Sequence, residues 1–460
     1  MTGRYKAYPE TKNSNTEWLD EVPTHWVVSK FAYVKTVLTD YTANGSFADL
    51  KKNVTYKDKP SFARLVRLTD LRRDLDNEGV WIDEGAYNYL KKSALFGGEF
   101  LLANVGAYAG LFYQMPYNKG AASLAPNMFM AKFSETKILP LFMAYVGQCD
   151  PINKQLTLNA TASSAQPKLN KDDFKSIKFC YPALIEQQKI ANFLEHETAK
   201  IDTLITKQEK LIELLKEKRQ AVISHAVTKG LNPDAPMKDS GVEWLGEVPE
   251  HWEVGRVKNL AKLISKGTTP STIGGGFIDE GIRFLKGENI GKSLFVNLSP
   301  TFYISEEVDA QLSRSRLQEN DVLVIIAGAT TGKASILTKE LLPANTNQAV
   351  SFIRPNKTIY SKLIALWLST EYAQRIIWMG AVQAAQPNLS MEDLGNLPIV
   401  LPDEDEVIPL LNEIDRKIEQ FDALTLKANS AIELIKERKT ALISAAVTGK
   451  IDVRDWQGEA

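Results

Sequence analysis

A stretch of about 44 residues occurs twice in this chain of 460 residues, first at 184–227 and again at 404–447. In both copies apolar residues recur at steps of three, four or seven, the spacing that places them in one narrow seam along a long helix. The seam residues are Ile190, Leu194, Ile201, Leu204, Leu211, Leu215 and Val222 in the first copy, and Leu410, Ile414, Phe421, Leu424, Ala431, Ile435 and Leu442 in the second. The pattern predicts two helices, each roughly 66 Å long at about 1.5 Å per residue. Because both lie in one chain, we expect them to pair with each other.

A second repeat precedes each helix. The phrase EWLDEVPTHWVV at 17–28 returns as EWLGEVPEHWEV at 243–254. The coinciding residues are Trp18 and Trp244, Pro23 and Pro249, His25 and His251, and Trp26 and Trp252. Such repetition indicates an internal duplication. For the two histidines, a duplicated packing role is favoured over catalysis.

About 150 residues of mixed character follow each phrase. Strand-like runs are separated by Gly, Asn and Asp turns. The runs include RLVRL, EFLLANV and MFMAKF in the first segment, and GIRFL, DVLVIIAG and AVSFIRP in the second. Both segments end at a shared phrase, Gln166-Pro-Lys-Leu and Gln386-Pro-Asn-Leu. A linker rich in Gly and Pro ends the first helix near Lys229.

The predicted order is a tail, a mixed domain and a helix, then a linker, a second domain and a second helix. The boundaries are 1–16 for the N-terminal tail, 17–180 for the first domain, 181–229 for the central helix, 230–242 for the linker, 243–400 for the second domain, 401–448 for the C-terminal helix and 449–460 for the C-terminal tail. Antiparallel pairing of the helices needs only short connections. The predicted fold class is therefore α+β, with two mixed α/β domains joined by an antiparallel intramolecular coiled coil of pseudo-twofold symmetry.

Charge and composition limit the partners and the compartment. The chain has 55 Lys and Arg against 56 Asp and Glu, so its net charge of −1 gives no overall basic signal for nucleic acid. Either it does not bind DNA, or its basic faces are offset elsewhere, or a partner supplies much of the grip on phosphates. The two cysteines, Cys149 and Cys180, argue for buried thiols and against a disulfide framework. Without an apolar signal core or a membrane-length apolar run, we expect a soluble, cytoplasmic protein that contacts no membrane.

The motifs for catalysis are weak. GATTGK at 328–333 has three residues between its glycines, whereas a phosphate loop needs four, with Ser or Thr after the lysine. The PD at 402–403 and the ERK at 437–439 match a nuclease pattern, but their carboxylates would lie near opposite ends of a helix. Four histidines and two cysteines are too few and too scattered for a zinc site. We therefore expect a non-catalytic chain without a metal or cofactor of its own.

What remains is recognition chemistry, because loops of both domains carry side chains suited to base edges and phosphates. The candidates are Lys51, Lys52, Arg64, Arg67, Arg72, Arg73, Asn104 and Tyr108 in the first domain, and Lys266, Thr268, Thr269, Ser271, Lys286, Asn289, Thr330, Thr331 and Lys333 in the second. For any single residue a solvated surface role is the simpler interpretation, so only the set predicts DNA binding. The loops at 266–271 and 328–333 are the strongest candidates, because small residues let backbone approach a ligand closely.

Together these features resemble the specificity subunit of type I restriction–modification enzymes. The resemblance covers nearly the whole chain. It is carried by the repeated EWL-x-EVP-x-HW phrases, the Gln-Pro phrases at 166 and 386, and the repeated helix ends that begin at Glu213 and Glu433. It implies that each mixed domain is a target recognition domain for one half of a bipartite, asymmetric site in double-stranded DNA. It also implies that the helices set the unspecified gap.

The resemblance further implies two kinds of partner. Two modification subunits would methylate adenine with S-adenosylmethionine, and two restriction subunits would act as motor and nuclease with ATP and Mg²⁺. These cofactors would then belong to the partner subunits. Near-neutral charge fits this expectation if the partners help to clamp the phosphates.

Two alternatives stay open on the sequence. A coiled-coil scaffold could bind protein rather than DNA through its end domains. The chain could also serve a methylation-only system, or a system whose nuclease is fused to its methyltransferase, because this subunit would look the same in each case.

Overall fold

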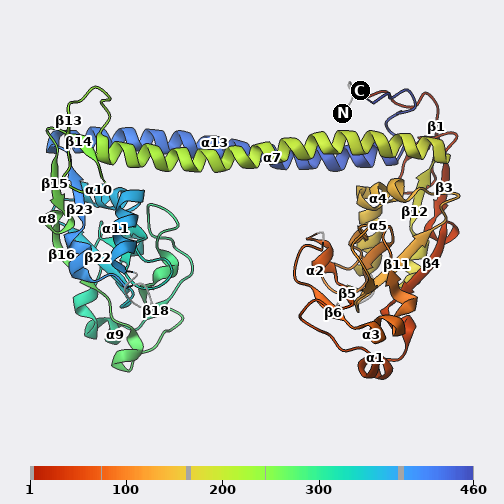
Figure 1. Ribbon diagram of the computed structural model, residues 1–460, viewed down its shortest axis with the longest axis horizontal. Helices are drawn as coiled ribbons and strands as arrows, with labels where there is room; N and C mark the ends of the chain where they lie inside the picture. The colour runs from red at the N-terminus through yellow and green to blue at the C-terminus, as the bar shows by residue number, and fades with distance from the viewer. Residues whose placement is uncertain (1–4, 74, 162–166, 244, 382–387, 459–460) are drawn as a thin grey trace. The chain divides into compact units, whose positions relative to one another are not determined.

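The computed structural model describes residues 5–73, 75–161, 167–243, 245–381 and 388–458 (Figure 1). Trp244, Gln166 and Gln386, which the sequence patterns single out, lie outside these residues. The chain forms two compact units. The first unit comprises 1–208 and 430–460, and the second unit comprises 209–429.

Both repeated stretches form long helices, as predicted. Helix α7 spans Leu184–Lys229 and helix α13 spans Glu404–Val447. Neither helix contains a glycine near its middle, and each ends where a glycine follows. Gly230 and Gly449 have φ of 76° and 74°, the left-handed conformation that closes a helix at little steric cost.

In the first unit the start of α7 packs against the end of α13. Ile190 and Leu194 share one buried cluster with Leu442. Beyond this cluster, Lys439 Nζ donates to Asp202 Oδ1 at 2.6 Å. Residue numbers therefore increase along α7 in the direction in which they decrease along α13, so the two helices are antiparallel in this unit.

In the second unit the end of α7 packs against the start of α13. Ile223 is buried together with Leu410 and Ile414. Arg219 Nε lies 3.4 Å from Asp422 Oδ1, at the repeat positions of the Lys439–Asp202 pair in the first unit. Each unit thus pairs one helix start with the other helix end, and the predicted antiparallel pairing is confirmed.

Three residues of the predicted seam, all nearer the middle of the helices, are exposed. The buried seam residues are Ile190, Leu194, Ile201, Leu410, Ile414 and Leu442, and the half-buried ones are Leu215, Val222, Phe421 and Ile435. The exposed ones are Leu204, Leu211 and Leu424. Their neighbours Ile205 and Ile212 are half-buried instead, and Ile432 is buried on α13. On α7 apolar residues stand at both adjacent positions, and a straight helix drifts by about 20° per heptad, so step counting alone cannot choose between them.

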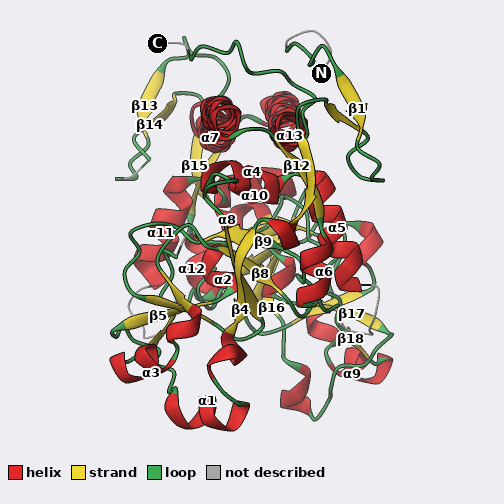
Figure 2. Ribbon diagram, turned by 90° about the vertical axis from the view of Figure 1, so that its right-hand side faces the viewer, coloured by secondary structure: helices red, strands yellow, loops and turns green. Residues whose placement is uncertain are grey.

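The mixed domain of the first unit is built on an antiparallel four-stranded sheet. Its strand order is β4 (Lys35–Asp40), β11 (Met128–Phe133), β8 (Phe100–Ala103) and β9 (Phe112–Gln114). A second sheet has the order β6 (Val80–Ile82), β5 (Ala63–Val66), β10 (Ala122–Leu124) and β7 (Ala94–Leu95), in which β5 and β10 are parallel. The helices beside them are α4 (Pro140–Gln148), α5 (Asp150–Thr161) and α6 (Lys171–Ser176). Figure 2 looks onto this unit, where α4 lies between the helix pair and the strands β8 and β9.

The mixed domain of the second unit repeats this design. Its four-stranded sheet has the order β16 (Ala261–Lys266), β22 (Val350–Pro355), β19 (Val322–Ile325) and β20 (Ala334–Ile336). A three-stranded sheet has the order β18 (Tyr303–Ile304), β17 (Ile282–Leu285) and β21 (Ala344–Thr346). The helices are α10 (Ile359–Leu368), α11 (Glu371–Ala381) and α12 (Met391–Asn396). The six predicted strand-like runs form β5, β8, β11, β17, β19 and β22, so the predicted mixed α/β character of both domains is confirmed.

The core of each unit runs from the sheet into the helix pair. In the first unit Phe31 and Phe142 share one cluster with Ile190. Cys149 and Cys180 are free and buried in the same cluster, as the sequence predicts. Across the described residues, no helix combines the length and the apolar character that a membrane crossing needs.

Candidate nucleic-acid interface

A two-stranded ribbon ties each mixed domain to the start of a long helix. In the first unit β3 (Val27–Lys30) pairs with β12 (Lys178–Tyr181), which leads into α7. In the second unit β15 (Glu253–Arg256) pairs with β23 (Pro398–Leu401), which leads into α13. The repeated EVP-x-HW phrase stands directly before β3 and β15. The phrase is therefore placed to connect domain and helix.

We call each of these connections between a mixed domain and the start of a long helix a joint. At each joint a tryptophan of the repeated phrase donates a hydrogen bond to a glutamate of the helix. Trp26 Nε1 donates to Glu186 Oε1 at 3.0 Å, and Trp252 Nε1 donates to Glu406 Oε2 at 2.6 Å. Both tryptophans are buried, and both glutamates lie in the first turn of their helix. The histidine before each tryptophan contacts the same carboxylate, at 2.8 Å in the first unit and 3.1 Å in the second. The two histidines therefore take part in the same duplicated contact.

The exposed candidates of the first unit come from three separate segments. Lys51 and Lys52 are exposed in the last turn of α1 (Phe47–Asn53). Elsewhere, the Arg72 guanidinium lies 4.9 Å from the centre of the Tyr108 ring, and both side chains are exposed. This contact joins the turn after α2 (Leu68–Leu71) to the loop after β8. The turn also carries the exposed Arg73, and the loop also carries the half-buried Asn104.

Two arginines of the predicted set form hydrogen bonds within the first unit, to Asp70 and to Asn77. Arg64 is buried, and its Nη2 donates to Asn77 Oδ1 at 2.6 Å. Arg67 Nε donates to Asp70 Oδ2 at 3.1 Å. Burial alone would raise the pKa of the Asp70 carboxyl, but hydrogen bonds from Arg67 and Asn77 hold that pKa below its usual range. Arg64 thus has an internal role instead of the predicted surface role, and Arg67 is only partly exposed.

The loop at 266–271 follows β16 and folds against β21. Thr268 N donates to Thr346 O at 3.2 Å. A Cβ atom on Gly267 would lie 1.9 Å from the same carbonyl oxygen, so this close approach requires glycine. The exposed candidates of the loop are Lys266 and Ser271, and the half-buried ones are Thr268 and Thr269.

The loop at 328–333 connects β19 to β20 as a tight turn. Thr331 is buried, and its Oγ1 donates to Gly328 O at 2.8 Å. Thr330 and Lys333 are exposed. Thr331 therefore shapes the turn from inside, in place of its predicted surface role, while its neighbours face solvent.

A third candidate pair in the second unit is also partly internal. Asn289 is buried, and its Nδ2 donates to Pro300 O at 2.7 Å, so its predicted surface role is corrected as well. Lys286 is half-buried, and its Nζ lies 3.4 Å from the centre of the Phe302 ring in a cation–π contact.

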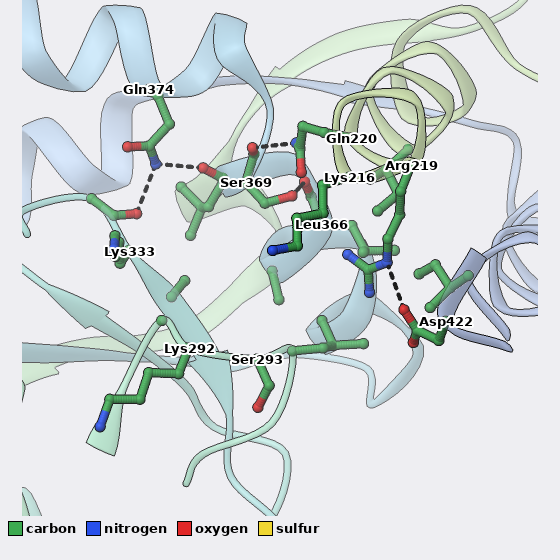
Figure 3. Close-up of a pocket in the computed structure, with 18 of the residues that line it drawn as sticks. Lys216, Arg219, Gln220, Lys292, Ser293, Lys333, Leu366, Ser369, Gln374 and Asp422 are labelled. Atoms are coloured by element: carbon green, nitrogen blue, oxygen red, sulfur yellow. Dashed lines mark hydrogen bonds and ion pairs between the residues drawn. The ribbon is translucent and has the colours of Figure 1, made fainter. Parts of the chain in front are cut away.

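Each unit also has a cleft between its part of the helix pair and its four-stranded sheet. In the second unit the cleft has a volume of about 660 Å³ (Figure 3). Its charged lining residues are Lys216, Arg219, Lys292, Lys333 and Asp422. The first-unit cleft has about 610 Å³ and is lined by Lys436 and Lys439 of α13. These lysines stand 220 positions after Lys216 and Arg219, so the duplication has placed the same basic helix positions in both clefts.

The second-unit cleft carries uncompensated positive charge. Arg219 is balanced by Asp422, but within the described part of the chain the ammonium groups of Lys216, Lys292 and Lys333 have no hydrogen-bond or ion-pair partner. Figure 3 shows Lys216 on α7 and the other two lysines on the loops of the mixed domain. Three ammonium groups around one cleft suit an anion such as a backbone phosphate. Lys216 and Lys292 are not in the set predicted from the sequence. Lys216 could have been found, because Lys436 stands at the same position in the second copy of the repeated helix end.

The family comparison matches both halves of the chain. The model of the type I restriction modification DNA specificity domain matches residues 43–214 and 249–441. The type I restriction enzyme EcoBI specificity subunit of Escherichia coli is 27% identical over 311 residues, which cover 66% of this chain and 64% of that subunit. The putative MjaX specificity subunit of Methanocaldococcus jannaschii is 23% identical over 452 residues, which cover 97% and 98% of the two chains.

Comparison with solved structures agrees at the level of the fold. A chain from the study of complex assembly and conformational transition of the type I R–M system has a TM-score of 0.63 and 16% sequence identity. The match covers 94% of this chain and 99% of that one. Because the domain model matches most of both halves, the chain belongs to the type I restriction–modification DNA specificity family.

Proposed function

We propose that the chain is the DNA-recognition subunit of a type I restriction–modification complex, and that each mixed domain reads one half of a bipartite, gapped site. One observation carries the proposal: the two units share the joint and the four-stranded sheet, yet present different side chains at matching places. Tyr108, stacked with Arg72, stands in the turn after β8, and Thr330 stands at the matching place after β19. Different side chains on one framework are what two different half-sites require.

The helix pair is proposed to set the gap between the half-sites. In support, α7 and α13 are each continuous, and both helices contribute to both units. The joints at Glu186 and Glu406 tie each mixed domain to a helix start. A change of helix length between the joints is then expected to change the gap.

The two basic clefts are proposed to contact DNA phosphates without regard to sequence. In support, their helix lysines stand at repeated positions, whereas the recognition loops differ. Phosphate contacts fix register and carry no direct sequence information. Such contacts would compensate for a net charge of −1 over the whole chain.

The helix pair is also proposed to dock two modification subunits that methylate adenine with S-adenosylmethionine, and two restriction subunits that use ATP and Mg²⁺. In support, exposed leucines recur at repeated positions, Leu204 with Leu424 and Leu214 with Leu434. Large apolar side chains that stay exposed in both copies of the helix are candidates for a partner surface. Catalysis and its cofactors would belong to these partners, since the matched relatives are named as specificity subunits.

An exchange of one domain tests the proposal. Residues 30–165 are replaced by the matching segment of a family relative, and the variant is expressed with its modification subunit. We expect a methylated motif in which one half-site has changed and the other half and the gap are retained. A change in both halves would contradict independent reading. Protein capture without any DNA motif would favour the scaffold alternative.

A further inference from the structure

In the first unit a tyrosine fills the space beside the helix joint. The Tyr8 hydroxyl donates to Glu186 Oε1 at 2.6 Å. Its ring centre lies 5.8 Å from that of His25 and 5.9 Å from that of Trp26. Burial, together with the bond to Glu186, raises the pKa of the Tyr8 phenol, so the group stays protonated and serves as a donor. Tyr8 is thus a buried aromatic side chain whose one polar atom is satisfied by the joint.

The matching place in the second unit is an open cleft of about 260 Å³. Its lining includes His251, Trp252 and Glu406, which are the counterparts of the three Tyr8 neighbours. When the two EWL phrases are aligned, the position of Tyr8 is taken by Asp234, which is exposed. The Glu406 side chain is accordingly 47% exposed, against 11% for Glu186. The second unit therefore keeps the walls and the acceptor of the tyrosine site without the tyrosine.

We propose that this cleft is a docking seat for a tyrosine side chain presented by a partner protein. The duplication indicates the occupant, because the same three side chains enclose a tyrosine in the first unit. Pro249 and Leu410 supply apolar walls for the ring, and Glu406 supplies an acceptor for the hydroxyl.

The acidic residues that line the cleft further limit which side chain can bind there. A phenylalanine would leave the Glu406 carboxylate without the donor that Tyr8 gives Glu186, and an acidic side chain would be repelled by Asp405 and Glu406. Tyr8 of a second copy is already buried in its own first unit, which favours a different protein as the source. The seat does not depend on DNA recognition, so it stands or falls separately from the proposed function.

A matched pair of probes tests the seat on the full chain. N-acetyl-L-tyrosinamide and N-acetyl-L-phenylalaninamide are titrated into protein labelled with 5-fluorotryptophan, and binding is followed by ¹⁹F NMR. Trp252→Phe assigns one of the eight tryptophan signals, and the others report that the fold is retained. We expect a saturable shift of the Trp252 signal with the tyrosine amide. Binding of the phenylalanine amide should be about tenfold weaker, as a hydrogen bond to a charged group is lost.

Two variants distinguish specific binding in this cleft from nonspecific binding of aromatic compounds. Glu406→Gln keeps an acceptor for Trp252 but removes the charge, so the preference for tyrosine should fall to less than about threefold. The matched variant Glu186→Gln should leave the preference unchanged. Equal affinity for both amides, no shift at Trp252, or a preference that survives Glu406→Gln would overturn the proposal. Self-association of the chain that Glu406→Gln abolishes would assign the seat to a second copy and overturn the choice of partner.

Discussion

Trp252 donates a hydrogen bond to Glu406 in the first turn of α13 at 2.6 Å, and Trp26 makes the same bond to Glu186 in α7 at 3.0 Å. Each tryptophan stands immediately before or at the ribbon that leads from the mixed domain toward a long helix. The joint therefore explains why the EVP-x-HW phrase recurs while the surrounding loops diverge. It fixes each domain to its helix and leaves the loops free to differ.

The two joints should differ in strength. Replacing Trp26 with Phe removes the donor from Glu186, whose side chain is 11% exposed, whereas Trp252→Phe affects Glu406, which is 47% exposed. A hydrogen bond to a charged group contributes about 1.5–3 kcal/mol, and water can replace it more easily where the carboxylate is exposed. We expect a loss near the upper value for Trp26→Phe and near or below the lower value for Trp252→Phe. Hydrogen exchange of the β3 and β15 amides measures each joint separately, and a larger loss at β15 would contradict the account.

We expect the loop at 266–271 of the second unit to tolerate only glycine at position 267. Gly267→Ala would place a Cβ atom 1.9 Å from Thr346 O, so the loop at 266–271 must move. Gly276→Ala is the matched control, because a Cβ atom there meets nothing within 4 Å. We expect Gly267→Ala to weaken or change reading of one half-site only, in a DNA-binding assay against each half-site mutated in turn. Unchanged recognition by Gly267→Ala would show that this loop does not contact bases.

The helix lysines of the clefts should affect affinity but not sequence preference. Lys216→Ala or Lys436→Ala is expected to weaken binding to all DNA sequences alike. Each substitution should reduce the slope of log affinity against log salt by about 1. Lys210→Ala is the control, because Lys210 stands on the same helix as Lys216 but does not line the cleft. A variant with an unchanged salt slope would remove that cleft from the interface.

The corrected seam makes a different prediction from the one that step counting gives. Ile432 is 6% exposed on α13, whereas Leu434 on the same helix is 65% exposed. Ile432→Asp buries an unpaired charge and should cost several kcal/mol, while Leu434→Asp should change stability by less than about 1 kcal/mol. Urea denaturation of the purified chain compares the two variants. Equal stability would mean that the helices do not pair as described.

The two thiols should be unreactive in the folded chain. Burial raises the pKa of Cys149 to about 12, and it raises the pKa of Cys180 as well. Because only the thiolate is nucleophilic, neither should react with iodoacetamide at pH 8 until the first unit unfolds. The raised values also mean that stability is lost as pH rises above 9, where thiols of the unfolded chain ionise first. Mass spectrometry of alkylated peptides, with and without urea, checks the reactivity, and labelling of native protein would contradict the packing of this core.

Features with a strong period could be predicted from the sequence. The helices follow from two continuous apolar repeats without interior glycine, and the strands β8, β11, β19 and β22 follow from short apolar runs between turns. The antiparallel pairing of the two helices follows from the short connections that it needs. The exposed residue of each adjacent pair, such as Leu204 beside Ile205, could not be predicted, because both are apolar and only the packed partner chooses between them.

The site could be predicted only in part, for a similar reason. Arg64 and Asn289 have the chemistry of DNA-reading residues, but their partners, Asn77 and Pro300, lie 13 and 11 positions away and become visible only in the fold. The basic clefts join residues of the helices to loops far away in sequence. The duplication is the exception, because the repeated phrase links Trp26 to Trp252 and so relates the two joints through the sequence alone.

This chain alone is proposed to decide which bipartite DNA sequence is modified. The most direct test is to sequence, with detection of modified bases, DNA from cells that express the chain together with its modification subunit. The account predicts methylated adenine in a new motif of two different halves separated by a fixed gap, lost when this chain is omitted. A soluble complex that produces no such motif, or a motif that persists without this chain, would contradict it.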